Sequence, residues 1–304
     1  MPTRTFEFVQ LDVFTCTPLM GNSLAVFTDA RGLTDKEMQA LAREMNLSET
    51  TFILPREPAV EAREGKKVRI FTVEEELPFA GHPTLGTALY LHAAGSAVDQ
   101  ITLDLKVGKI PVRFSGDAKD TSRTRADGQV FGEMRQRDPE FGVVLRREEV
   151  ARVIGVGVDD IASEWPCQVV SAGLPFAIVP FRDPQTLAGL KNNAAQSAKL
   201  LEGAGARFFY FLCLEPREGR LAARARMFFY GGEDPATGSA AGCAASWLAK
   251  YGLAKPDEQV VIHQGGEAGR PSEIFVRAKC EDGRVTDVRV GGYAIEILSG
   301  VVTL

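Results

Sequence analysis

A glutamate in an apolar setting is the first residue suited to proton transfer. Glu49 lies in the segment 46–52, between Leu47 and Phe52. A carboxyl group beside apolar side chains suits general acid–base catalysis, because such surroundings favour its protonated form over the charged one. A solvated glutamate in a loop is the alternative interpretation, which this segment alone leaves open.

Two glycine turns open two apolar helices and carry further candidate residues. The first turn contains Gly81 and His82, and the second contains Gly238 and Ser239. A helix start leaves backbone N–H groups without helical partners and attracts negative charge. We therefore predict that the two starts together bind a carboxylate. Alternatively, the glycines only turn the chain and Ser239 only caps its helix.

Asp234 and His82 stand next to these turns and have plain structural alternatives. Asp234 precedes Pro235, and this dipeptide often opens a turn. A histidine at a helix N-terminus is expected to be neutral and can donate or accept a hydrogen bond. It could equally be only a capping residue.

The elements that must position these residues follow from local patterns. Thr34 and Glu37 form a capping-box pair that begins a helix ending at Met45, with Asn46 as its left-handed cap. The segments 83–94 and 240–251 are helices without a wide charged face, so we expect both to be buried. The polar segment 115–138 is expected to be a loop between domains.

The chain contains an internal repeat. A shift of 157 residues, without gaps, places Glu76 on Glu233 and Gly81 on Gly238, and it matches the glycines that end the two apolar helices. The same shift pairs further residues of the preceding strands and of the helices: Phe52 with Phe209, Arg69 with Arg226, Phe71 with Phe228, Pro78 with Pro235, Ala88 with Ala245, Leu91 with Leu248 and Gly95 with Gly252. The repeat predicts two similar lobes.

Four segments resemble the PhzF family. They are residues 10–27, with Gly21 and Asn22; residues 46–52; residues 79–88, which read FAGHPTLGTA; and residues 233–240, which read EDPATGSA. The resemblance covers nearly the whole chain. It implies an α+β fold like that of diaminopimelate epimerase. This fold has two pseudo-symmetric lobes, each a curved, mostly antiparallel sheet wrapped around a central helix.

The resemblance also implies domains and site residues. We expect an N-terminal lobe at 1–128, joined by a last strand at about 294–304, and a C-terminal lobe at 129–293. The implied catalytic residues are Glu49, which would shuttle a proton, with His82, Asp234 and Ser239. The implied substrate-binding residues are Asn22, Ser48, Gly81, Thr237 and Gly238.

The implied function is a cofactor-independent isomerase that moves a proton between carbons of a small carboxylate in a cleft between the lobes. The family's founding reaction uses a dihydro-hydroxyanthranilate. One base suffices for such a shift, whereas a racemase needs two. Relatives that racemise use two cysteines, and the repeat places Ala80 and Thr237 at those positions. Two alternatives remain: an epimerase with Glu49 and Asp234 as opposed bases, and a non-catalytic binding protein.

Composition narrows the remaining classes. The net charge of −5 lacks a basic excess that would indicate nucleic-acid binding. The three histidines have no metal-ligand spacing, and no nucleotide-binding loop is present, so no metal or cofactor is expected. Five cysteines without a paired motif, a strand-like start and no long apolar run predict a cytoplasmic protein without a membrane partner. A homodimer is expected.

Overall fold

Residues 1–135 and 291–304 form one unit of the computed structural model, and residues 136–290 form the other. The structure describes residues 3–95, 98–115, 129–191, 194–215, 220–229 and 232–304. The division therefore falls at 135/136 and 290/291, a few residues from the expected boundaries. The last strand belongs to the first unit. The fold is α+β, with strands in mixed sheets and helices packed against them.

All elements of the first unit except its last strand come from the N-terminal part of the chain. They are β1 (Thr5–Val13), β2 (Asn22–Phe27), α1 (Asp35–Met45), β3 (Glu49–Ile53), α2 (Pro58–Glu64), β4 (Lys66–Phe71), β5 (Glu76–Leu77), α3 (Gly81–Ala93), β6 (Gln100–Leu105), β7 (Gly108–Ser115), β8 (Phe131–Arg135) and β19 (Ala294–Thr303).

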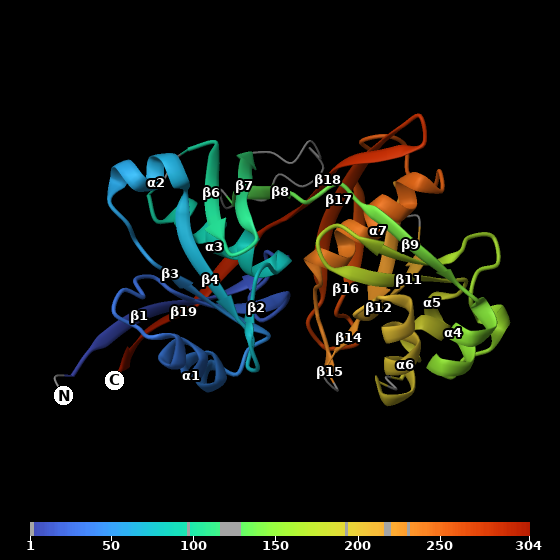
Figure 1. Cartoon of the computed structure of the whole chain (residues 1–304), viewed down its shortest axis with the longest axis horizontal. Helices are drawn as coiled ribbons and strands as arrows, with labels where there is room; N and C mark the ends of the chain where they lie inside the picture. The colour runs from blue at the N-terminus through green and yellow to red at the C-terminus, as the bar shows by residue number, and fades with distance from the viewer. Residues whose placement is uncertain (1–2, 96–97, 116–128, 192–193, 216–219, 230–231) are drawn as a thin grey trace. The chain divides into compact units, whose positions relative to one another are not determined.

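The strands of this unit surround α3. Strand β1 pairs antiparallel with both β19 and β2, and β2 runs parallel to β3. The chain of pairs continues through β4, β6, β7 and β8. Helix α3 contacts β1, β2, β3, β6, β7, β8 and β19, and it lies among these strands in Figure 1. A Cβ at Gly86 would come within 2.7 Å of the side chains of Leu24 and Val13, so this glycine permits the close approach.

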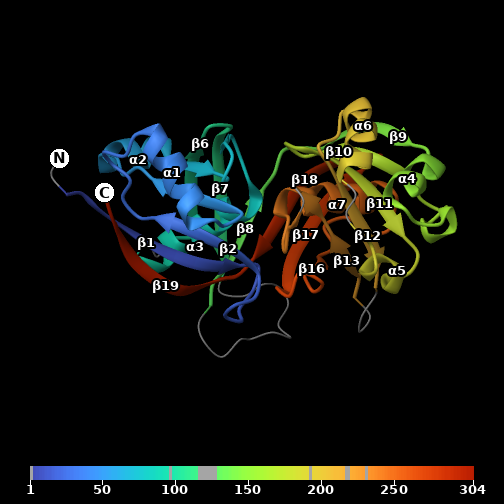
Figure 2. The ribbon, with the colours of Figure 1, turned by 90° about the horizontal axis from the view of Figure 1, so that it is seen from below.

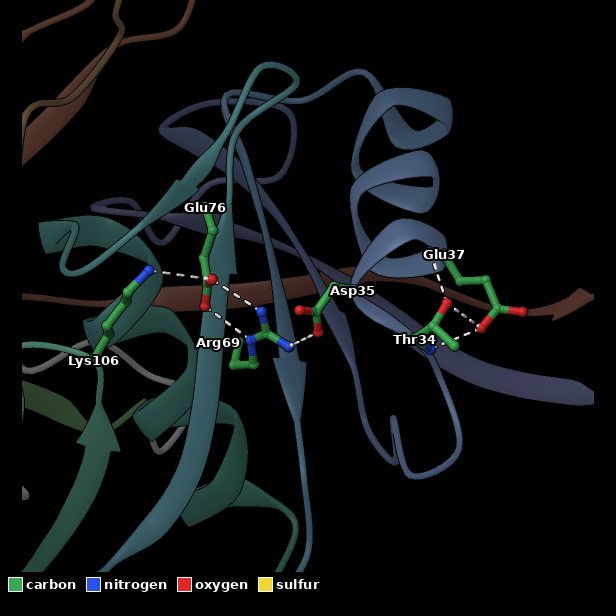
Figure 3. Close-up of polar contacts among 6 residues, drawn as sticks. All are labelled: Thr34, Asp35, Glu37, Arg69, Glu76 and Lys106. Carbon is green, nitrogen blue, oxygen red and sulfur yellow. Dashed lines mark hydrogen bonds and ion pairs between the residues drawn. The ribbon is translucent and has the colours of Figure 1, made fainter.

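A second core lies between the sheet and α1. Phe27 stacks on Phe52 at 4.9 Å, and Phe52 meets Phe71 edge-on at 5.4 Å. The expected capping box is confirmed, with Thr34 and Glu37 bonded reciprocally (Figure 3). Asn46 ends the helix with a left-handed φ of 51°. These local signals therefore fix where α1 begins and ends.

The second unit follows the same plan with more elements. They are β9 (Glu140–Leu145), α4 (Arg147–Ile154), a 3₁₀ turn (Val158–Asp160), β10 (Cys167–Ser171), β11 (Pro175–Phe181), α5 (Pro184–Ala188), α6 (Ala194–Ala204), β12 (Phe208–Leu214), β13 (Ala222–Arg226), β14 (Phe228–Phe229), β15 (Gly232–Glu233), α7 (Gly238–Lys250), β16 (Val260–Gln264), β17 (Ser272–Glu281) and β18 (Arg284–Gly292).

Helix α7 is the central helix of this unit. It contacts β10, β11, β12 and β17, and most of its residues are buried. Figure 2 shows α4 and α6 at the periphery of the unit and α7 among its strands. Strand β11 runs parallel to β12, as β2 does to β3 in the first unit. The two buried helices expected from the sequence are thus confirmed.

The repeat extends to the boundaries of the central helices. Helices α3 and α7 start at 81 and 238 and end at 93 and 250, the same 157-residue offset. Both begin two residues earlier than predicted. The expectation that Pro83 is the first helical residue and Ser239 the N-cap was therefore wrong. The N-caps are Ala80 and Thr237, because the glycines already adopt helical geometry.

The expectation that the segment 115–138 is a loop between domains is also corrected in part. Residues 116–128 of the segment 115–138 lie outside the described residues, but 131–135 form β8, which pairs with β7. Phe131 and Met134 of this strand are buried, so part of the segment belongs to the core of the first unit. Among the described residues, no helix is long and apolar enough to cross a membrane.

Candidate active site

Glu49 and His82 face each other in the first unit. Glu49 is the first residue of β3 and pairs in register with Leu24, so it is not the solvated loop residue of the alternative interpretation. Its Oε2 lies 3.6 Å from Nε2 of His82. The two side chains are 16% and 4% exposed. The structure therefore brings two predicted catalytic residues together in a largely buried setting.

The protonation state of His82 follows from its surroundings. Burial lowers the pKa of His82 to about 3, and a hydrogen bond with the backbone of Ser23 offsets part of that effect. The ring is therefore neutral at pH 7, as expected, although burial is the main cause. Among the described residues Nε2 has no hydrogen-bond partner, so the bond to Ser23 uses Nδ1. Nε2 then presents its lone pair towards Glu49.

The remaining predicted residues of this unit flank the same strands. Asn22 begins β2 and is buried, and Ser48 is half-buried in the turn before β3. Gly21, before Asn22, has a φ of 69°, and a Cβ there would lie 2.4 Å from the Val13 carbonyl oxygen. Gly81 is the first residue of α3 and is buried. All of these residues cluster along β2, β3 and the start of α3.

The second unit holds the other predicted residues at the start of α7. Asp234 is 9% exposed and receives a 2.7 Å hydrogen bond on Oδ2 from the hydroxyl of Thr237. Its backbone N–H donates to the Met227 carbonyl at 2.9 Å. Gly238 and Ser239 are the first two residues of α7, and Ser239 is half-buried. Asp234 and Thr237 are thus directly joined.

The two helix starts share properties that suit an anion. In the described structure neither Ala80 nor Thr237 makes a side-chain capping hydrogen bond, and neither first turn contains an acidic residue. Their backbone N–H groups can therefore point at a negatively charged ligand. Within the described residues no cluster of three or more His, Cys, Asp or Glu side chains could hold a metal ion.

An arginine supports each of the two turns. Arg69 binds Glu76 through two hydrogen bonds of 2.8 and 2.9 Å and also reaches Asp35, while Lys106 lies 3.5 Å from Glu76 (Figure 3). These bonds lower the pKa of Glu76 and raise that of Arg69. The pair sits on β4 and β5, just before the turn that carries His82.

The same pair occurs in the second unit at the 157-residue offset. Arg226 binds Glu233 through bonds of 2.8 and 2.7 Å. Its third nitrogen donates to three carbonyls at the end of the α5 region, those of Leu187, Ala188 and Leu190. The repeat matches both arginines and both glutamates, but no local pattern indicates that they pair.

A buried glutamine was missed altogether. Gln264, the last residue of β16, is 2% exposed and bonds to the backbone of Asp234 and to Thr237. Position 107 of the first unit, which the repeat matches to it, is a valine. No local pattern marks Gln264, because its partners lie 27 and 30 residues away.

Comparisons with known proteins agree on one family. The model of the family described as phenazine biosynthesis-like protein, PhzC-PhzF, matches residues 11–300. The chain is 36% identical to trans-2,3-dihydro-3-hydroxyanthranilate isomerase of Pseudomonas aeruginosa over 97% of this chain and 98% of the relative.

Solved structures share the fold. A PhzF-family phenazine biosynthesis protein of Bacillus anthracis is similar at a TM-score of 0.84 and 26% identity, over 98% of this chain and 99% of that one. A hydroxyproline epimerase of Agrobacterium vitis is similar at a TM-score of 0.65 and 12% identity, over 100% of this chain and 93% of that one. At that identity the second likeness shows the diaminopimelate epimerase-like fold alone.

Proposed function

Because the chain belongs to the phenazine biosynthesis-like, PhzF-type family, we propose that it moves a proton between carbons of a small cyclic carboxylate without a metal or organic cofactor. The chain is an isomerase, as its curated relatives are. The proposed substrate is trans-2,3-dihydro-3-hydroxyanthranilate or a close analogue, after the name of the relative. The observation that carries the proposal is the carboxyl group of Glu49 facing the neutral ring of His82.

Glu49 is the proposed proton carrier. Its carboxylate removes a proton from one ring carbon, the electron pair shifts through the conjugated double bonds, and the protonated carboxyl returns the proton to a more distant carbon. One base acting on one face is enough, and nothing is consumed. The lone pair on Nε2 of His82 can accept a hydrogen bond from Glu49 while it holds the proton. The 3.6 Å separation would shorten when substrate fills the site.

The other predicted residues bind and orient in this proposal. Gly81 and Gly238 would offer the free N–H groups of α3 and α7 to the substrate carboxylate, with Ser239 beside them. Asn22, Ser48 and Thr237 would contribute further polar contacts. Asp234 would hold a polar or cationic group of the substrate. We further propose that the two units bring these residues to one cleft.

An epimerase is the second candidate, supported by the buried carboxyl of Asp234 at the second helix start. It would use Glu49 and Asp234 on opposite faces of one carbon. Two-thiol racemisation is disfavoured, because the N-cap positions of the two central helices hold Ala80 and Thr237. A protein that binds the ligand without reaction is the third candidate.

One incubation separates the three. The protein is mixed with trans-2,3-dihydro-3-hydroxyanthranilate in deuterated water, and NMR and mass spectrometry follow the ring carbons. The proposal expects a product with shifted double bonds and a new sp³ carbon, and any deuterium there reports exchange with solvent. Inversion at one carbon with unchanged double bonds would favour the epimerase. Binding without conversion of this substrate or its ring analogues would contradict both.

Cellular context is also a proposal. All five cysteines are free thiols, which fits a reducing cytoplasm. We propose that the enzyme works there as a homodimer and binds no nucleic acid. Light scattering coupled to size-exclusion chromatography measures the assembly, and a monomer at micromolar concentration would contradict the dimer.

A further inference from the structure

A buried chain of hydrogen bonds in the second unit ends on Asp234. The hydroxyl of Tyr210 lies 3.0 Å from Oε1 of Gln264, and Nε2 of Gln264 lies 2.9 Å from Oγ1 of Thr237. Oγ1 of Thr237 is in turn 2.7 Å from Oδ2 of Asp234. Each of the four residues is at most 9% exposed, so little water competes with these bonds.

The direction of every bond in this chain is fixed. Oε1 of Gln264 faces two donors, the hydroxyl of Tyr210 and the backbone N–H of Thr237 at 3.2 Å. Nε2 faces two acceptors, the carbonyl of Asp234 at 2.7 Å and Oγ1 of Thr237. Because Oγ1 already accepts from the amide, the single proton of Thr237 goes to the Asp234 carboxylate. The hydrogen bond that this hydroxyl donates to Oδ2 stabilises the negative charge on the carboxylate.

The backbone beyond Gln264 holds the same turn. Gly265 has a φ of 82°, and a Cβ on it would lie 2.4 Å from the carbonyl oxygen of Pro235 and 2.4 Å from that of Arg270. The end of β16 therefore packs directly on the backbone of the Asp234–Pro235 turn. A glutamine at this strand end reaches both the carbonyl of Asp234 and its side-chain partner.

We propose that Gln264 is a positioning residue that, through Thr237, fixes the orientation of the Asp234 carboxylate and keeps it a hydrogen-bond acceptor for the substrate. Removal of the amide leaves Thr237 free to turn its hydroxyl away from Asp234. The test of this proposal by enzyme turnover rests on the proposed function. The state of the carboxylate itself can be read without any substrate.

The variants are Gln264→Met, Gln264→Glu, Thr237→Val and Thr237→Ser, with Gln168→Met as the matched control. Gln168 is likewise buried, accepts from the hydroxyl of Tyr251 at 2.7 Å and donates to the carbonyl of Gly142 at 3.0 Å. It makes the same kinds of bonds in the same unit, without contact to Asp234. Thermal unfolding shows which variants fold.

The first measurement is the ¹³Cγ resonance of Asp234 in ¹³C-aspartate-labelled protein, assigned by its loss in Asp234→Asn. We expect its titration midpoint to move to higher pH in Thr237→Val and Gln264→Met, and to stay in place in Thr237→Ser and Gln168→Met. In Gln264→Glu the new carboxylate takes the Thr237 hydroxyl, so the midpoint should move at least as far. An unchanged titration midpoint of Asp234 in Thr237→Val would overturn the proposal, even if Gln264→Met does not fold.

The second measurement is turnover of the accepted substrate. A hydrogen bond to a charged group is worth roughly a ten- to hundredfold change, so kcat/KM of Gln264→Met and Thr237→Val should fall by about that factor. The acidic limb of the pH profile should move with the resonance. Equal losses in Gln264→Met and Gln168→Met would reduce Gln264 to a structural residue. If wild type turns nothing over, the proposed function fails and the resonance still decides this inference.

Discussion

Replacing Arg226 with methionine should destabilise the second unit more than the same change at Arg69 destabilises the first. The Arg226 side chain is 7% exposed and that of Glu233 13%, and the guanidinium makes five hydrogen bonds, two to Glu233 and three to backbone carbonyls. Removing one partner of a buried ion pair costs about 3–5 kcal/mol, because the other charge stays buried and unpaired.

The Arg69 pair is the matched case. Both of its side chains are 20% exposed, and Lys106 remains 3.5 Å from Glu76 after the change. Loss of Arg69 should therefore cost about 1.5–3 kcal/mol, the range of a hydrogen bond to a charged group. The double variant Arg226→Met with Glu233→Met should regain part of the loss, because an apolar pair carries no unpaired charge.

Urea unfolding measures these differences. Both tryptophans, Trp165 and Trp247, lie in the second unit, so their fluorescence follows that unit, while circular dichroism follows the whole chain. The reasoning is refuted if Arg226→Met unfolds at the same urea concentration as Arg69→Met, or if the double variant is no more stable than Arg226→Met alone.

Two further predictions concern the buried ring of His82 and the packing of Gly86. Since burial lowers the pKa of His82 to about 3, the unfolded chain takes up a proton below about pH 6.5 that the folded protein refuses, so stability falls as pH decreases from 6.5 towards 3. The melting temperature of His82→Gln should fall less over that range, and identical curves for both proteins would count against a buried neutral ring. Gly86→Ala should cost about 1–3 kcal/mol, because its Cβ meets Leu24 and Val13 at 2.7 Å. Gly203→Ala, in a helix with open space around it among the described residues, should be neutral or stabilising by up to about 1 kcal/mol. An order of stability in chemical unfolding with Gly86→Ala at or above Gly203→Ala would contradict this packing argument.

The parts of the fold visible in the sequence are those with short-range or repeated signals. The capping box of Thr34 and Glu37 spans three residues, so its geometry follows from the helix itself. The two apolar helices were visible because nearly every side chain on them is small or apolar. Their first residues were misplaced, since Pro83 and Ser239 also suit positions inside the first turn.

The supports of the candidate site come from contacts between distant segments. Gln264 reaches Tyr210 across 54 residues, and Arg226 reaches Leu187 across 39. Such pairs have no period or spacing along the chain, so only tertiary packing reveals them. Glu49 is an intermediate case: the sequence is the basis for proposing proton transfer by this residue, but its place at the start of a strand depends on the pairing of β3 with β2.

The central claim is that Glu49 carries the proton, and Glu49→Gln tests it most directly. Glutamine keeps the size and shape of this glutamate side chain, which is 16% exposed, so the substitution should change stability by no more than about 1 kcal/mol. General acid–base catalysis is worth about a hundred- to ten-thousand-fold, and a sole carrier should reach the top of that range. Glu44→Gln, on the exposed side of α1, is the matched control.

The measurement is product formation and deuterium uptake by wild type, Glu49→Gln and Glu44→Gln on one accepted substrate, with folding verified by circular dichroism. We predict that wild type and Glu44→Gln form product at similar rates, while folded Glu49→Gln loses both turnover and uptake by about ten-thousand-fold. Product formation by folded Glu49→Gln within tenfold of wild type would contradict the account.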